Sequence, residues 1–266
     1  MSAMPTETFA PIEVIEGTVE SGFLFLADHA SNALPPEYGT LGLPATELQR
    51  HIGWDPGTAA IVRALAARFQ APALLTCFSR LLIDPNRGET DPTLIMRLSD
   101  GAVVPGNARI DAAERARRIT RFYRPYHDAV AAAIDRAIER GQPPIILSMH
   151  SYTPVWRGYP RPWHCGILWD NDPRLPQILI AALGRDPALV VGDNEPYDGA
   201  LRDDTMFRHA TSRGLAHAII EVRQDLIGHA DGAAEWADRI AGIIAPLAAD
   251  PALRAIRHHG SRTDPR

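Results

Sequence analysis

Three short apolar runs in this sequence each lead to a residue that can bind a metal ion or carry a proton. The runs at 23–27 and 144–149 lead to His29 and His150, and a third run leads to Glu221. Apolar runs of this length are typical of buried strands. Because ligands in open α/β sheets bind outside the carboxyl ends of the strands, the three runs predict one shared site.

Predicted strands alternate with predicted helices along the chain. This alternation favours an α/β fold with a mostly parallel, mixed sheet that is flanked by helices on both faces. The predicted strands cover residues 22–27, 73–78, 81–84, 144–149, 165–169, 189–191 and 216–222. The predicted helices cover residues 58–69, 111–140, 175–183, 204–211 and 233–248, and Pro125 should kink or split the second of them.

Length and composition are those of an ordinary globular protein. The chain has 266 residues, of which 45% are hydrophobic and 22% are charged. No repeat or change of composition marks a domain boundary. We therefore expect one domain over residues 1–266, with a core at about 22–248 and flexible ends at 1–20 and 251–266.

Charge and cysteine content exclude several classes of partner. A net charge of -5 provides no basic field for nucleic acid or an anionic membrane. The sequence shows neither a signal peptide nor an apolar run that spans a membrane. Its two cysteines, Cys77 and Cys165, argue against a disulfide framework. We expect a cytoplasmic protein with a small-molecule substrate and without nucleic-acid or membrane partners; the sequence leaves the oligomeric state open.

His29, His150 and Asp55 are the candidate ligands of a divalent metal ion, for which zinc is the first choice. Histidine is the commonest metal ligand, and catalytic zinc takes three protein ligands and leaves a position for water. Glu221 is the candidate base that activates this water. A carboxylate within an apolar run is buried, and a buried charge needs a metal, a cation or a catalytic role.

Structural roles compete with these assignments. A histidine at a strand end can simply bind a backbone group. Asp55 precedes Pro56, which is the pattern of a helix N-cap before residues 58–69. Asp28 and Asn32, beside His29, are lesser ligand candidates.

Arg80, Arg87 and Arg223 are candidate binding residues for an acidic substrate. Guanidinium groups bind carboxylates through two parallel hydrogen bonds. The competing interpretation is a surface arginine or one paired with an aspartate, and Asp84 is a ready partner for Arg87.

Two loops stand out near these candidates. Residues 88–107 form a long irregular segment of a kind that is usually functional or mobile, and the sequence leaves open whether it closes over the substrate. Residues 152–163 form an aromatic, proline-rich loop. The sequence has neither a glycine-rich phosphate-binding motif nor a serine-nucleophile motif.

Seven short blocks resemble the N-formylglutamate amidohydrolase family, and they recur in order over most of the chain. The blocks are Ala27-Asp-His29-Ala-Ser-Asn, His51-Ile-Gly-Trp-Asp55-Pro-Gly-Thr, Ser79-Arg80-Leu-Leu-Ile-Asp84-Pro-Asn-Arg87, Tyr123-Arg-Pro-Tyr-His127, Met149-His150-Ser-Tyr-Thr-Pro, Gly192-Asp-Asn-Glu-Pro-Tyr-Asp198 and Ile220-Glu221-Val-Arg-Gln-Asp-Leu226.

This resemblance implies a fold related to zinc carboxypeptidases and aspartoacylases, with the metal at strand ends. It also implies that His29 and His150 bind the metal, that Glu221 is the general base, and that the enzyme serves amino-acid degradation such as histidine catabolism. The wider group carries His-x-x-Glu at its first ligand pair, whereas this chain has His29-Ala-Ser-Asn32. The carboxylate ligand is therefore assigned to Asp55.

Three functional hypotheses follow. The first is a zinc-dependent amidohydrolase that cleaves the acyl amide of an N-acylated acidic amino acid such as N-formyl-L-glutamate. The second is a carboxypeptidase-like hydrolase of peptides or cell-wall fragments, for which the aromatic loop 152–163 would bind a larger ligand. The third is a non-catalytic protein that binds small anions and in which Glu221 pairs with an arginine.

Overall fold

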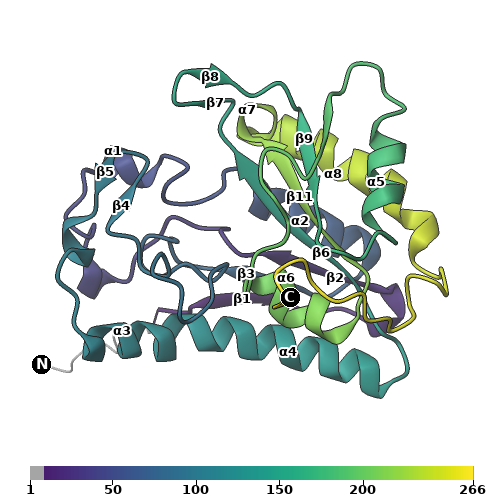
Figure 1. Cartoon of the computed structure of the whole chain (residues 1–266), viewed down its shortest axis with the longest axis horizontal. Helices are drawn as coiled ribbons and strands as arrows, with labels where there is room; N and C mark the ends of the chain where they lie inside the picture. Colours follow the sequence, from purple (N-terminus) through teal and green to yellow (C-terminus); the bar gives the residue numbers. More distant parts are fainter. Residues whose placement is uncertain (1–8, 266) are drawn as a thin grey trace, which may run out of the picture.

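A seven-stranded mixed sheet forms the centre of the protein in the computed structural model, which describes residues 9–265. The strand order is β1-β3-β2-β6-β11-β9-β10 (Figure 1). The strands of this sheet are β1 (Ile12–Ile15), β2 (Phe23–Ala27), β3 (Ala73–Thr76), β6 (Ile145–Tyr152), β9 (Cys165–Leu168), β10 (Val191–Asp193) and β11 (His217–Arg223). Two hairpins stand apart from it, β4 (Leu98–Ser99) with β5 (Ala102–Val103) and β7 (Val155–Trp156) with β8 (Tyr159–Pro160).

The middle of the sheet is parallel and its flanks are mixed. Strands β3, β2, β6 and β11 run parallel to one another, whereas β1 and β9 run antiparallel to β3 and β11. The parallel β6–β11 pair places His150 directly opposite Glu221. The predicted α/β class with a mostly parallel, mixed sheet is thus confirmed.

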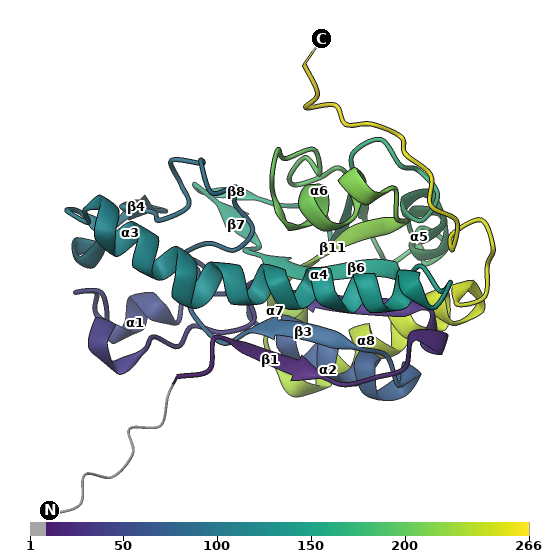
Figure 2. The ribbon, with the colours of Figure 1, turned by 90° about the horizontal axis from the view of Figure 1, so that it is seen from below.

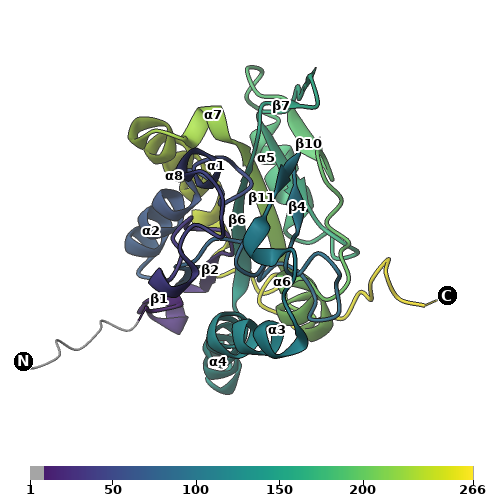
Figure 3. The ribbon, with the colours of Figure 1, turned by 90° about the vertical axis from the view of Figure 1, so that its left-hand side faces the viewer.

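Helices cover both faces of this sheet. Their bounds are α1 (Ala45–Leu48), α2 (Thr58–Phe69), α3 (Ala112–Arg118), α4 (Arg124–Glu139), α5 (Pro176–Leu183), α6 (Thr205–His209), α7 (Gln224–Ile227) and α8 (Ala230–Ile244). Alternate residues of β2 face opposite ways: Phe23 and Phe25 pack with α2, α5 and α8, while Leu24 and Leu26 pack with α4 and α6. Figure 3 shows α2 and α8 on the side of the sheet opposite α6.

Two strand predictions are wrong. Residues 81–84 form a turn followed by irregular chain, and Leu81, Leu82 and Ile83 pack into a cluster beneath the loops rather than into the sheet. Strand β6 continues past His150 to Tyr152, so His150 lies within the strand instead of at its end. The reason is the pairing with β11, which extends as far as the partners Tyr152 and Arg223.

The chain ends contain more structure than the sequence analysis expected. Strand β1 lies within the segment 1–20 that we predicted to be flexible, and it pairs with β3. Within the expected tail 251–266, Leu253 is buried and the Nε of Arg254 donates a hydrogen bond to the carbonyl of Pro143 at 2.9 Å. Residues 1–8 and 266 lie outside the described part of the chain.

The predicted helix 111–140 divides near Pro125, as expected. Asp111 caps α3 by accepting a hydrogen bond from the Glu114 N–H, and a π-helical segment at Ile119–Tyr123 separates α3 from α4. The three segments follow one another as a single long rod along the molecule (Figure 2). Proline lacks a backbone N–H, and the wider turn accommodates this loss.

Asp55 does not cap α2, contrary to the competing interpretation of its sequence pattern. Gly57 occupies the N-cap position with φ 88°, and no side chain caps this helix. A Cβ atom on Gly57 would lie less than 3.0 Å from the carbonyl oxygen of Ile227. Glycine therefore lets α2 start close to α7, and the Asp55 carboxylate remains available for the site.

We predict that Gly57→Ala lowers the free energy of unfolding by about 3 kcal/mol, because a left-handed alanine costs roughly 1–2 kcal/mol and overpacking adds roughly 1–3 kcal/mol. The control is Gly101→Ala, which shares the left-handed conformation at φ 79° but has nothing within 4 Å of its Cβ position. Urea titration should show a clearly larger loss of unfolding free energy for Gly57→Ala than for Gly101→Ala. Equal losses would contradict the close approach to Ile227.

Candidate active site

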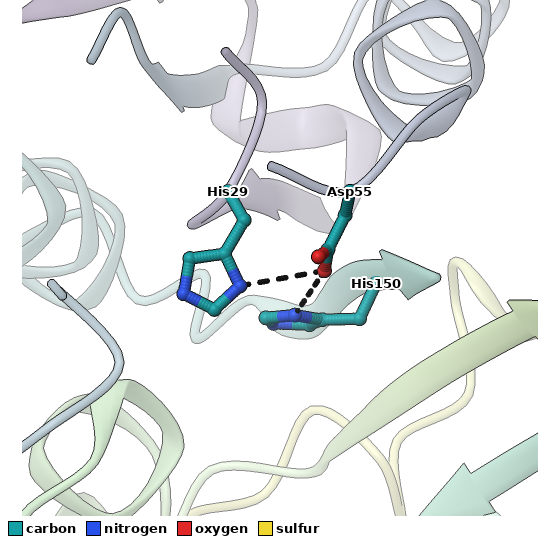
Figure 4. Close-up of side chains that lie close together, drawn as sticks. All are labelled: His29, Asp55 and His150. Atoms are coloured by element: carbon teal, nitrogen blue, oxygen red, sulfur yellow. Dashed lines mark hydrogen bonds and ion pairs between the residues drawn. The ribbon is translucent and has the colours of Figure 1, made fainter. Parts of the chain in front are cut away.

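His29, Asp55 and His150 converge on one buried point (Figure 4). The Asp55 Oδ2 lies 3.3 Å from the His29 Nδ1 and 3.0 Å from the His150 Nδ1. One ligand atom from each residue lies within 4.8 Å of the others. The structure thus brings together all three residues that the sequence analysis chose as metal ligands.

Three different elements position these side chains. His29 lies in the turn after β2, His150 lies in β6, and Asp55 lies in the segment that leads into α2. The backbone N–H of Asp55 donates a hydrogen bond to the His29 carbonyl at 2.9 Å. This bond fixes the two loops to each other, so the imidazole and the carboxylate meet.

Each histidine binds a second carboxylate through its other ring nitrogen. The His29 Nε2 lies 2.7 Å from the Asp84 Oδ1, and the His150 Nε2 lies 3.3 Å from the Asp28 Oδ2. A carboxylate that accepts the Nε2 proton leaves the Nδ1 lone pair free for a metal ion. The sequence did not predict that these carboxylates bind the histidines, although Asp28 directly precedes His29 and Asp84 lies in one of the family blocks.

The donor set fits a divalent metal ion. Two imidazole nitrogens and one carboxylate oxygen suit zinc, and each of the two histidines has a carboxylate behind it. The Asp55 Oδ1 is buried without a hydrogen bond, although the His51 Nδ1 lies 3.3 Å away. An unsatisfied buried oxygen of this kind is what a cation would satisfy.

Electrostatics keep the carboxylates of this cluster ionised. Burial pushes the pKa of Asp55 upward, but His29 and His150 outweigh it and hold this pKa well below its usual range. For Asp84, burial is likewise outweighed by Arg80 and His29, and its pKa is lowered. Burial lowers the pKa of His150, yet Asp28 and Asp55 together raise it well above its usual value.

Glu221 is buried beside this cluster and is poorly satisfied. Its side chain lines the same cavity as His29 and His150, and its Oε2 has no hydrogen-bond partner. Burial raises the pKa of the Glu221 carboxyl to about 7, while His150 opposes this rise. Such a carboxylate can take up and release a proton near neutral pH.

Arg80 and Arg87 also line the cavity and share one counterion. The Arg80 Nη2 donates to the Asp84 Oδ2 at 2.8 Å, and the Arg87 Nε lies 4.0 Å from the same oxygen. The Nε atoms of both arginines are buried without a hydrogen-bond partner. Since His29 also binds Asp84, the two guanidinium groups retain positive charge for an anionic ligand.

Arg223, the third predicted binding residue, does not line the cavity. Its Nε donates to the Asp225 Oδ1 at 2.8 Å, and its Nη1 donates to the carbonyls of Arg161 and Trp163. These bonds tie the end of β11 to the loop that follows the β7–β8 hairpin. The structure therefore separates Arg223 from Arg80 and Arg87.

Residues outside the cavity hold the loop that carries Arg87. The Tyr123 hydroxyl donates to the Arg87 carbonyl at 2.7 Å, and the Thr205 N–H donates to the Asn86 Oδ1 at 3.2 Å. Tyr123 lies at the end of the π-helical segment and Thr205 begins α6. The sequence alone had no signal for these contacts, because they join segments that are far apart in the chain.

The cavity has a volume of about 550 Å³, and both hairpins contribute to its lining. Met96, Ser99 and Asp100 line it from the long segment 88–107, and Trp156 lines it from the β7–β8 hairpin. His51 also faces the cavity, and burial lowers the pKa of its imidazole to about 4. The four-residue spacing between His51 and Asp55 was a signal that the sequence analysis did not use.

Among residues 9–265 no helix is long and apolar enough to cross a membrane.

Comparison with known proteins identifies the family of this chain. A family model of N-formylglutamate amidohydrolases matches residues 21–228. The structure of a gene product from Agrobacterium tumefaciens is 34% identical, with a TM-score of 0.83, and the match covers 89% of this chain and 94% of that chain. An N-formylglutamate amidohydrolase from Ralstonia eutropha shares the fold with a TM-score of 0.65 at 24% identity, over 90% of this chain and 97% of that chain. A search of curated proteins finds no match. The resemblance seen in the sequence is confirmed, and the chain belongs to the N-formylglutamate amidohydrolase family, a family of amide hydrolases.

Proposed function

We propose that this protein is a metal-dependent amidohydrolase that cleaves the acyl amide of an N-acylated acidic amino acid. The observation that carries the proposal is the convergence of His29, Asp55 and His150 beside the buried, unsatisfied Glu221. Arg80 and Arg87, whose Nε atoms have no hydrogen-bond partner, line the same cavity and support a substrate with a carboxylate. N-formyl-L-glutamate is the first substrate to test, since the family carries its name.

His29, Asp55 and His150 would hold the metal ion, for which zinc is our first choice. A bound zinc ion supplies a Lewis acid that polarises a carbonyl group and lowers the pKa of water. Asp28 and Asp84 orient the two imidazoles by accepting their Nε2 protons. We also propose a cytoplasmic location and a role in amino-acid breakdown for this protein, as the sequence predicts.

Glu221 would move the proton that hydrolysis requires. Water adds its oxygen to the amide carbon as the C–N bond breaks, and a proton must reach the leaving nitrogen. The Glu221 carboxylate takes this proton from the water and delivers it to the nitrogen. Arg80 and Arg87 would hold the substrate carboxylate so that the amide lies over this base.

The two alternative functions differ in how well the site supports them. A non-catalytic anion binder needs Glu221 to pair with an arginine, but within residues 9–265 Glu221 forms no ion pair and Arg223 pairs with Asp225 instead. A carboxypeptidase-like hydrolase would use the same metal site on a larger ligand. Trp156 in the cavity lining could contact such a ligand, which favours the carboxypeptidase-like hydrolase over the non-catalytic anion binder.

We expect the purified protein to contain about one zinc ion per chain, as catalytic zinc sites do. His150→Ala should lower this content at least tenfold, because it removes a ligand and leaves Asp28 and Asp55 without their shared partner. The exposed His258→Ala is the matched control and should keep the metal. Elemental analysis of chelator-free preparations is the measurement, and a metal-free wild type that stays empty after dialysis against zinc would contradict the proposal.

Glu221→Gln should lower kcat on N-formyl-L-glutamate by roughly 10²–10⁴-fold, the usual contribution of a positioned acid–base group. The amide keeps the size of the carboxylate but cannot accept the proton, so metal content should remain. Glu139→Gln, on the exposed surface of α4, is the control for loss of one charge. Turnover near the wild-type rate in a folded, metal-loaded Glu221→Gln protein would exclude the proposed base.

Arg87→Met should raise KM for N-formyl-L-glutamate by roughly 10- to 100-fold with little change in kcat, since a charge-assisted hydrogen bond contributes about 1.5–3 kcal/mol. Arg223→Met is the control, because its guanidinium binds Asp225 outside the cavity. Steady-state kinetics of both variants would separate the two arginines. Equal effects on KM would show that the cavity lining does not identify the carboxylate site.

A further inference from the structure

The cavity is larger than an N-formylated amino acid requires. Its volume of about 550 Å³ lies in the range of pockets that enclose drug-sized ligands. N-formyl-L-glutamate has only about a dozen non-hydrogen atoms, at the small end of such ligands. Much of the remaining lining is apolar, and it comprises Ile52, Met96, Leu168, Leu201 and Ile219.

An aromatic side chain completes this lining at the β7–β8 hairpin. Trp156 lines the cavity, and its side chain is 37% exposed. By contrast, Tyr159, its partner across the hairpin, is 78% exposed and does not line the cavity. One of the two aromatic residues of this hairpin thus lines the cavity, whereas the other is exposed to solvent.

Arg161 holds this hairpin in place. Its side chain is buried, and its guanidinium carbon lies 5.3 Å from the ring centre of Trp156, 5.4 Å from that of Tyr152 and 5.1 Å from that of Tyr197. Its Nη1 donates to the Thr153 carbonyl at 3.3 Å. A cation surrounded by three rings fixes them relative to one another, so Trp156 is built into the wall. The exposed Arg157 lies over the same indole at 5.5 Å.

Other charges that line the cavity are already paired. Arg50 donates to Glu47 at 2.6 Å and to Asp100 at 2.8 Å, and Asp198 accepts from Arg262 at 2.6 Å. Beyond Arg80 and Arg87, which are available to the two carboxylates of a glutamate, these paired residues offer an acyl group no free cation. An apolar group would instead gain contact with Trp156 and the apolar lining.

We propose that the β7–β8 hairpin forms a subsite for a flat, apolar acyl group larger than formyl, such as an aromatic acyl group. This inference rests on the proposed function: with the carboxylate at Arg80 and Arg87 and the amide at the metal centre, the acyl group is the part that extends to Trp156. The arginine side chains are 15% and 27% exposed, whereas Trp156 is 37% exposed. Trp156 is the specificity-determining residue, and Arg161 is a positioning residue that acts through it.

The test compares two ligands that differ only in the acyl group. Isothermal titration of the Glu221→Gln protein with N-benzoyl-L-glutamate and N-formyl-L-glutamate measures binding without turnover. We expect the benzoyl compound to bind about tenfold more tightly, from aromatic contact and apolar burial. Trp156→Ala, made in the same background, should bring the ratio of the two dissociation constants to within about twofold of one.

Three further variants separate a positioning role from general damage. Tyr159→Ala removes the exposed ring of the same hairpin and should leave the ratio as it was. Arg161→Met should reduce the ratio, and Arg161→Lys should restore part of it, because lysine keeps a cation among the rings. Thermal melting of each variant checks that the protein remains folded.

The outcomes distinguish this subsite from the proposed function. Equal affinities for the two ligands, or an unchanged ratio in Trp156→Ala, would overturn the subsite even if the wild type hydrolyses N-formyl-L-glutamate. If the wild type hydrolyses neither compound but the affinity ratio still depends on Trp156, the proposed hydrolysis fails and the subsite remains as a binding site.

Discussion

The Asp55 carboxylate connects the parts of the candidate active site. Its Oδ2 lies between the Nδ1 atoms of His29, in the turn after β2, and His150, in β6. Its backbone N–H binds the His29 carbonyl, so the side chain and the main chain act together. Without this residue two buried imidazoles would face each other with no anion between them, an arrangement that burial disfavours.

A buried carboxylate of this kind is stable only if its surroundings compensate its charge. Asp28 and Asp84 stand behind the histidines, and each has further partners: the Tyr126 hydroxyl donates to Asp28, and Arg80 donates to Asp84. Charges therefore alternate outward from the centre, from carboxylate to imidazole to carboxylate to guanidinium or hydroxyl. This alternation explains how one small volume can hold so many ionisable groups, and it links the candidate metal ligands to Arg80, which lines the cavity.

The helices on the face of the sheet that α4 and α6 cover also help to position residues of the cavity. The π-helical segment ends at Tyr123, which binds the backbone of Arg87, and α6 begins with Thr205, which binds Asn86. The side of the cavity that carries Arg87 thus depends on helix positions, whereas the candidate metal ligands depend on the sheet and on the start of α2. A change in one helix can therefore move the Arg87 loop without disturbing the candidate metal ligands.

The sequence by itself determined the class of the fold and the candidate residues of the site. Apolar runs marked the strands β2, β6 and β11, and these runs led to or contained His29, His150 and Glu221. Burying a polar side chain costs free energy unless it is paired, so these three residues stood out as candidates for a functional role. The same pattern rule failed at residues 81–84, where apolar side chains pack beneath loops, and at β1, whose short run has little signal of its own.

Only the tertiary structure decided between the roles that the sequence left open. It freed Asp55 from the helix N-cap, because Gly57 takes that position, and it placed Arg223 outside the cavity, because β11 continues past Glu221 and Asp225 lies within reach. It also assigned Asp28 and Asp84 to the histidines. The contacts of Asp28 and Asp84 with the histidines, and the approach of Gly57 to Ile227, depend on distances between segments that are remote in the chain, and local patterns of residues carry no information about such distances.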